Sequence, residues 1–145
     1  QLFDRYKYDF WAALEKRSRY DALIARLPEN IPAVVAAWWL ASEVYNGGFK
    51  QYFQNTYGGM IDEAIRGLDL TGQVNYAAAA RLAKKEFGGD VPFDRRERNT
   101  AVDAICEKNP DCWSDAEALF SSGGNEEWAR YERQANEFAR GLLDR

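Results

Sequence analysis

The sequence predicts a single all-α domain of about seven to nine helices packed around one buried central helix. Apolar residues recur every three or four positions along most of the chain, and no alternating strand pattern of useful length occurs. Residues 34–40 are apolar on every face, as expected of a helix surrounded by others. The 145 residues suffice for one domain, spanning 1–145, with a core of its own.

The first third of the chain contains the predicted central helix. Residues 6–27 place apolar side chains three and four positions apart among charged ones, which predicts one or two amphipathic helices closed by Pro28. Asn30 is suited to cap the next helix, and Pro32 lies near its first turn, where a missing amide hydrogen costs nothing. This central helix is expected over about 31–45.

The triplet Asn46-Gly47-Gly48 follows the central helix. Asparagine and glycine tolerate left-handed backbone angles, so the triplet predicts a sharp corner between two helices. Beyond the corner, Phe49 and Phe53 lie one turn apart on a packing face. Gln51 and Asn55 lie one turn apart on a face that can form hydrogen bonds.

Five more helices are predicted in the rest of the chain. The first two are expected to form an antiparallel hairpin, because a short turn containing Gly72 separates them. The predicted helices are 60–70, 74–87 ending at Gly88-Gly89, 94–108 capped by Asp94, a short helix begun by a capping box of Ser114 and Glu117, and a last helix capped by Asn125 that runs almost to the C-terminus.

Composition excludes several classes of function. The formal charge of −4 and the pI near 5.0 give no attraction to nucleic-acid phosphates. The chain has no histidine, which excludes Ser-His and Cys-His catalysis and histidine-based zinc sites. Cys106 and Cys112 match no metal or redox motif, so we interpret them as unpaired structural thiols. No cofactor or metal is expected.

The sequence also bears on localisation. No stretch reaches the roughly 18 apolar residues that a membrane span needs, and the first residues do not form a charged-then-apolar leader. We therefore expect a cytoplasmic protein that binds neither membranes nor nucleic acid directly. The sequence begins at Gln1 without a methionine, which leaves open whether a leader was removed.

The segment Trp38 to Asn55 resembles a bacterial all-helical family whose best-known member is a DNA-mimic protein. The resemblance rests on Trp38-Trp39-Leu40, Asn46-Gly47-Gly48-Phe49, Gln51, Tyr52-Phe53 and Asn55, extends through 60–87, and continues more loosely from Asp111, over about two-thirds of the chain. It implies a homodimer that presents carboxylates spaced like duplex phosphates and occupies the DNA-binding surface of a transcription factor, with no enzymatic activity.

One stretch of the chain carries charges of only one sign. Residues 112–128 contain acidic side chains and no Lys or Arg, and the candidate partner-binding residues are Asp115, Glu117, Glu126 and Glu127. Helix capping or the helix dipole would also account for three of these four. Over the whole chain, 19 basic residues nearly balance 23 acidic ones, so composition alone does not predict a coherent acidic surface.

The corner residues allow two interpretations. Glu43, Asn46, Gln51 and Asn55 could form a polar pocket for a small ligand, or the amides could satisfy backbone groups exposed at the corner. We favour the second, in which Glu43, Asn46, Gly47, Gly48, Phe49, Gln51, Phe53 and Asn55 are a fold signature. A basic cluster of Arg95, Arg96 and Arg98 is interpreted as part of a solvated helix face.

The leading functional hypothesis is a non-enzymatic protein-interaction domain, regulatory in role, with DNA mimicry toward a DNA-binding protein as a special case. Two alternatives stay open. One is a small-molecule binder or enzyme that uses a pocket at the Asn46 to Asn55 corner. The other is an immunity or antitoxin-like protein that binds a basic toxin.

Overall fold

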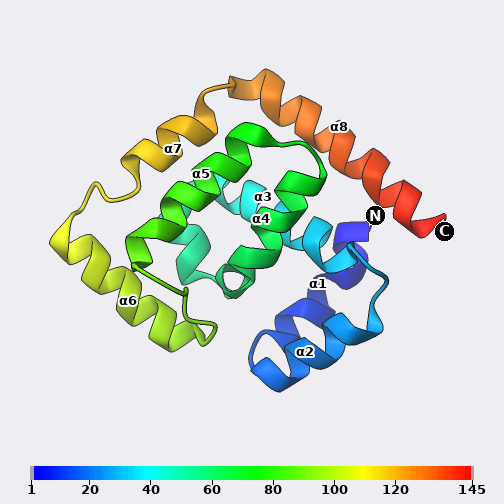
Figure 1. Ribbon diagram of the computed structural model, residues 1–145, viewed down its shortest axis with the longest axis horizontal. Coiled ribbons are helices and arrows are strands. Elements are labelled where there is room, and N and C mark those ends of the chain that lie inside the picture. Colours follow the sequence, from blue (N-terminus) through cyan, green and yellow to red (C-terminus); the bar gives the residue numbers. More distant parts are fainter. Residues whose placement is uncertain (1, 145) are drawn as a thin grey trace.

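A computed structural model describes residues 2–144 and confirms the all-α prediction. Within these residues the chain forms eight α-helices and two 3-10 helices and contains no strand. Figure 1 shows their arrangement. The bounds are α1 Leu2–Ala13, α2 Arg17–Arg26, α3 Ile31–Gln54, η1 Thr56–Met60, α4 Ile61–Leu70, α5 Val74–Lys84, η2 Lys85–Phe87, α6 Arg95–Lys108, α7 Ser114–Ser121 and α8 Gly124–Leu143.

Helix α3 is the centre of the fold, as predicted. Residues 31–37 are all buried, and Leu40, Ala41 and Val44 continue the buried stripe. In Figure 1, α3 lies behind the α4–α5 pair, with α7 and α8 on one side and α1 and α2 on the other. A helix that is apolar all round is stable in this position because every face packs against a neighbour.

The range of α3 is longer than the predicted 31–45 because it includes a second helical segment, which begins beyond the predicted corner. The backbone of Gly48 has φ 82° and ψ −179°, and helical geometry resumes directly afterwards and continues to Gln54. The predicted cap is also different. Asn30 has a left-handed backbone and no capping hydrogen bond, and its side-chain oxygen instead accepts a hydrogen bond from Arg66 at 2.9 Å.

Helices α4 and α5 form the predicted hairpin and cover α3. The turn between them contains Gly72 at φ 72°, a left-handed conformation that favours glycine. Gly67 of α4 lies directly against the Ala33 carbonyl of α3, where a side chain would not fit. The second predicted helix ends earlier than expected, because the chain tightens into η2 before the left-handed Gly88.

Helices α6, α7 and α8 follow one another around one edge of the molecule (Figure 1). The predicted cap of α6 is confirmed, since Asp94 accepts a hydrogen bond from the Glu97 nitrogen at 2.9 Å. The capping box at Ser114 is wrong, because α7 begins there without a side-chain cap and Glu117 bonds elsewhere. Asn125 is no cap either, since α8 already starts at Gly124.

Aromatic rings connect the two ends of the chain to the centre. Trp38 of α3 stacks on Phe3 of α1 at 4.7 Å between centroids and also contacts Trp128 and Tyr131 of α8. Its neighbour Trp39 stacks on Tyr57 at 4.8 Å. Both tryptophans therefore pack between elements. In the part of the chain that the structure describes, no helix combines the length and apolarity needed to span a membrane.

Candidate functional site

The corner of α3 depends on a backbone conformation that only glycine adopts readily. At φ 82° and ψ −179°, Gly48 lies in a region that is closed to residues with a side chain. A Cβ atom at this position would also come within 2.6 Å of the Glu117 carboxylate. The sequence prediction of a glycine corner is therefore confirmed, and Gly48 is the residue that forms it.

Three of the four polar corner residues converge on one another. The Glu43 carboxylate accepts hydrogen bonds from the side-chain amides of Gln51 and Asn55, each at 3.0 Å. Asn46 is exposed and takes no part. The amides thus bind a carboxylate across the bend, whereas we expected them to bind free backbone groups. That expectation was wrong because Glu43 lies on the same side of α3 as both amides.

A residue far along the chain satisfies the backbone of the corner. Phe49 follows the kinked glycine, and its nitrogen donates to the Glu117 carboxylate of α7 at 3.1 Å. Glu117 is half-buried, and this contact accounts for its position better than the predicted capping box does.

Two arginines of α6 satisfy the carbonyl groups at the end of α3. Arg98, which is 1 % exposed, donates to the carbonyls of Phe53 at 2.6 Å and Asn55 at 2.8 Å. Arg95 donates to the Gln54 carbonyl at 2.9 Å. A helix end normally leaves such carbonyls unpaired. Burial lowers the pKa of Arg98 below its ordinary value.

The interpretation of Arg98 as part of a solvated face was therefore wrong. Its remaining donors bind the carbonyls of Pro92 and Phe93, so every bond runs to backbone. The helical spacing contained the signal, because Arg98, Val102 and Ile105 fall on one face of α6. A charged residue in line with a buried stripe indicates an internal role.

The four predicted partner-binding carboxylates have different surroundings. Asp115 and Glu126 are exposed. Glu117 binds the Phe49 nitrogen, and Glu127 is buried, where it accepts a hydrogen bond from Asn75 at 3.0 Å. Only Asp115 and Glu126 are thus placed to contact a partner directly, while the other two hold the surface on which they lie.

The exposed acidic residues continue beyond this set into α6. We define the acidic arc as Asp103, Glu107, Asp111, Asp115 and Glu126, all of them exposed. Within residues 2–144, none of these carboxylates forms an ion pair, whereas the four ion pairs that occur lie on α2, α4 and α5. The carboxylates of the arc therefore stay free of the ion pairs that carboxylates on α2 and α4 form.

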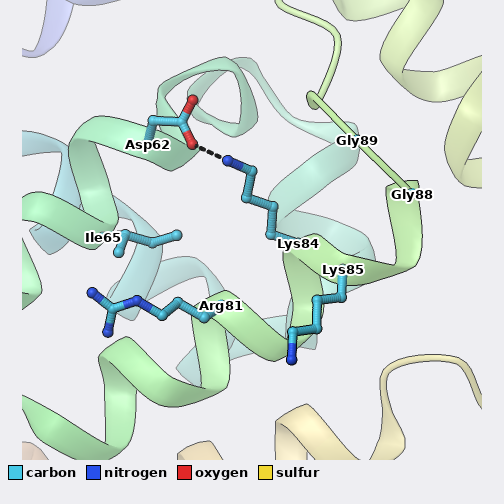
Figure 2. A pocket seen from close by; sticks show the side chains of 7 residues that line it. All are labelled: Asp62, Ile65, Arg81, Lys84, Lys85, Gly88 and Gly89. Carbon is cyan, nitrogen blue, oxygen red and sulfur yellow. Dashed lines mark hydrogen bonds and ion pairs between the residues drawn. The ribbon is translucent and has the colours of Figure 1, made fainter.

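A hollow of 630 Å³ between α4 and α5 was not predicted from the sequence (Figure 2). Ile65 lies on its wall, and Gly88 and Gly89 form one rim. Its cations are largely neutralised, because Lys84 binds Asp62 at 2.6 Å and Arg81 binds Asp69. Figure 2 shows Lys84 reaching toward Asp62 while Lys85 points the opposite way. Lys85 is its one cation without an ion pair among the described residues, and Lys85 points away from Lys84, so the hollow has no convergent charges that would select a ligand.

Few other side chains are candidates for catalysis or metal binding. Cys106 and Cys112 are free, half-buried thiols, and burial, with the neighbouring Cys106, raises the pKa of Cys112 to about 11. A raised pKa keeps a thiol protonated and unreactive at neutral pH. Within residues 2–144, no group of three or more acidic or cysteine side chains is placed to hold a metal ion.

One protein-family model matches the part of the sequence that carries most of these features. A model described as DMP19-like protein matches residues 25–140. The matched span contains the corner, both arginines that bind the end of α3, and the whole acidic arc. Neither a curated protein nor a solved structure matches the chain.

Proposed function

The chain belongs to the DMP19-like family, a family of DNA-mimic proteins, and on this premise we propose that it is a non-enzymatic protein-interaction domain that binds the basic surface of a DNA-binding protein. DNA-binding proteins present Lys and Arg to phosphates, so an acidic surface of suitable shape can occupy the same groups. A regulatory role follows, because a partner held in this way is kept from its DNA.

The acidic arc is the observation that supports this proposal. Residues 99–129 contain seven carboxylates and one lysine, a formal charge of −6, so the other residues together carry +2 of the total of −4. Charge is thus segregated along the chain, although the overall balance conceals it. Because α6, α7 and α8 follow one edge (Figure 1), the helices and the turn that carry the five exposed carboxylates of the arc follow one another along that border.

The charge pattern favours complementarity to a basic surface over a full copy of a DNA duplex. Lys108 lies between Glu107 and Asp111, and Arg130 follows soon after Glu126. A duplex carries one phosphate charge about every 1.7 Å along its axis without interruption. Five exposed carboxylates steer a basic partner and set its orientation, while affinity requires a packed interface as well.

Affinity capture with a matched pair of variants tests the proposal. The arc variant combines Glu107→Gln, Asp111→Asn, Asp115→Asn and Glu126→Gln. The control variant makes the same change in charge at exposed carboxylates elsewhere that form no ion pair within residues 2–144, through Asp4→Asn, Asp9→Asn, Glu15→Gln and Glu29→Gln. Each protein is immobilised and exposed to lysate from the native host, and bound proteins are identified and challenged with duplex DNA.

We expect the original protein and the control variant to retain the same DNA-binding protein, which duplex DNA releases, and the arc variant to lose it. Raising the salt concentration should weaken retention, because exposed charges are screened within about 10 Å at 0.1 M. Equal capture by the arc variant, or a bound protein that DNA does not displace, would contradict the proposal.

A further inference from the structure

A small pocket opens beside the acidic arc, where α3, α5, α7 and α8 meet. It has a volume of 160 Å³ and is lined by Tyr45, Tyr76, Phe120, Ser121, Gly124 and Asn125. Pockets for drug-sized ligands span about 300 to 1,000 Å³. This pocket is therefore suited to a single protein side chain rather than to a metabolite or cofactor.

The walls of the pocket are fixed before any ligand arrives. Tyr45 stacks on Trp128 at 4.5 Å between centroids, and its hydroxyl donates to the Asn125 side chain at 3.1 Å. On the other wall, Tyr76 stacks on Phe120 at 4.2 Å. Preformed walls lower the ordering cost of binding. Tyr45 nevertheless stays 52 % exposed, so the pocket is open to a partner.

The pocket contains a polar group without a partner. Tyr76 is 2 % exposed, and within residues 2–144 its hydroxyl makes no hydrogen bond, although it is not one of the fully enclosed unpaired polar atoms. A hydroxyl that water can reach pairs with water, which a ligand donor can replace. Burial, and after it the nearby Glu127 carboxylate, raises the pKa of Tyr76 to about 12, so the hydroxyl is neutral and can accept a hydrogen bond.

Charge and aromatic surface together select the chemistry of the ligand. Glu127 uses one oxygen to bind Asn75, and Glu126 is exposed next to the Asn125 rim. Among the described residues, Arg130 is the one cation that acts on the Tyr76 hydroxyl, so these two carboxylates outnumber the nearby positive charge by two to one. Aromatic faces attract cations, and a nearby carboxylate adds to that attraction. An apolar side chain would leave the Tyr76 hydroxyl unpaired, a neutral polar one would gain nothing from the carboxylates, and an acidic one would be repelled by them.

We propose that this pocket, which we call the tyrosine socket, takes one Lys or Arg side chain of the basic partner. The inference rests on the proposed function and adds the anchor that the acidic arc lacks. An anchor side chain in a preformed pocket contributes far more to an interface than an exposed ion pair does. The arc then attracts and orients the partner, while the socket sets how long it stays bound.

The first test uses small peptides and needs no knowledge of the partner. Isotope-labelled protein is titrated with acetylated, amidated Gly-Arg-Gly, with its Lys counterpart, with a neutral citrulline counterpart, and with acetate. Nuclear magnetic resonance follows the Trp128 indole and the backbone amides of Gly124 and Asn125. We expect saturable shifts with the Arg or Lys peptide, and at least tenfold weaker binding of citrulline. Equal binding of citrulline, stronger binding of acetate, or no saturable shift would overturn the proposal.

The second test fills the socket. Ser121→Leu places an apolar side chain at the mouth of the pocket, and Ala118→Leu adds the same group at an exposed position one turn earlier on α7. Circular dichroism verifies that both variants fold. Ser121→Leu should abolish the peptide-induced shifts and weaken retention of the captured partner at least tenfold, while Ala118→Leu should behave as the original protein does.

The two proposals fail in different ways. If Ser121→Leu retains the partner fully while the arc variant loses it, the socket proposal is wrong and the proposed function stands. If the arc variant loses nothing, the proposed function fails, and the peptide titration alone then decides whether the socket binds cationic side chains.

Discussion

The carboxylate of Glu117 accepts a hydrogen bond from the backbone nitrogen of Phe49 at 3.1 Å, across 68 positions of sequence. This contact joins α7, on the acidic edge, to the corner of the central helix. The corner is thus completed by a side chain from the surface that we propose to bind the partner. Stability of the corner and shape of the acidic edge therefore depend on one carboxylate.

Replacing Glu117 tests the importance of this contact. Glu117→Ala leaves the Phe49 nitrogen without its acceptor, which should lower the free energy of unfolding by about 1 to 3 kcal/mol. Glu117→Gln keeps an oxygen in place and should recover much of that loss. Urea denaturation of both variants measures the difference. Equal stability of the two variants would show that the hydrogen bond is unimportant.

The two corner glycines should respond differently to alanine. Gly48→Ala forces a side chain into a backbone region open essentially to glycine alone, and should lower the free energy of unfolding by about 1 to 3 kcal/mol or more. Gly47→Ala meets only the flexible end of Gln51, which can rotate away at the expense of its hydrogen bond to Glu43, and should cost less. Thermal unfolding followed by circular dichroism ranks the two, and the reverse order would contradict our account of the corner.

Arg98 should be essential to stability although it is charged. Arg98→Met retains much of the volume and leaves the carbonyls of Phe53 and Asn55 unpaired in the interior, so we expect a loss of more than about 3 kcal/mol. The matched change Arg96→Met lies on the exposed side of α6 and should alter stability by less than about 0.5 kcal/mol. Similar urea midpoints for both variants would contradict this prediction.

Alkaline pH should destabilise the fold through its buried tyrosines. Burial raises the pKa of Tyr52 and Tyr131 above the ordinary range. Their stabilising contribution is complete below the unfolded pKa of about 10 and is lost as pH rises above it, with a slope of about 1.4 kcal/mol per pH unit for each tyrosine.

The variant Tyr131→Phe isolates one of these groups, since within residues 2–144 the Tyr131 hydroxyl makes no hydrogen bond that the change would remove. Urea unfolding between pH 8 and pH 11 should show a shallower decline in this variant than in the original protein. Parallel curves would mean that Tyr131 does not titrate as its burial implies.

Local periodicity predicted the helices well, and long-range contacts account for what it missed. The apolar run in α3, the periodic α4 and the Asp94 cap depend on residues within a few positions of one another, so the sequence was sufficient there. The roles of Arg98 and Glu117 depend on carbonyl and amide groups 45 and 68 positions away. No local pattern specifies such a pairing.

In the candidate sites too, local patterns were predictable from the sequence and long-range packing was not. The sequence located Asp115 and Glu126 within an acidic stretch, and both are exposed. It did not predict the tyrosine socket, whose walls come from four helices that are separated along the chain. Tyr45 and Tyr76 lie on different helices, and only their packing against Trp128 and Phe120 makes them walls of one pocket.

The order in which a ribosome makes the chain gives the corner of α3 a further consequence. Residues 31–54 emerge first, but the groups that bond their last turns, Arg95, Arg98 and Glu117, are synthesised much later. A nascent chain that stops before residue 117 therefore lacks the acceptor for Phe49. A product truncated before residue 117 should therefore have a less stable corner in its central helix and be cut by proteases more readily than the full chain.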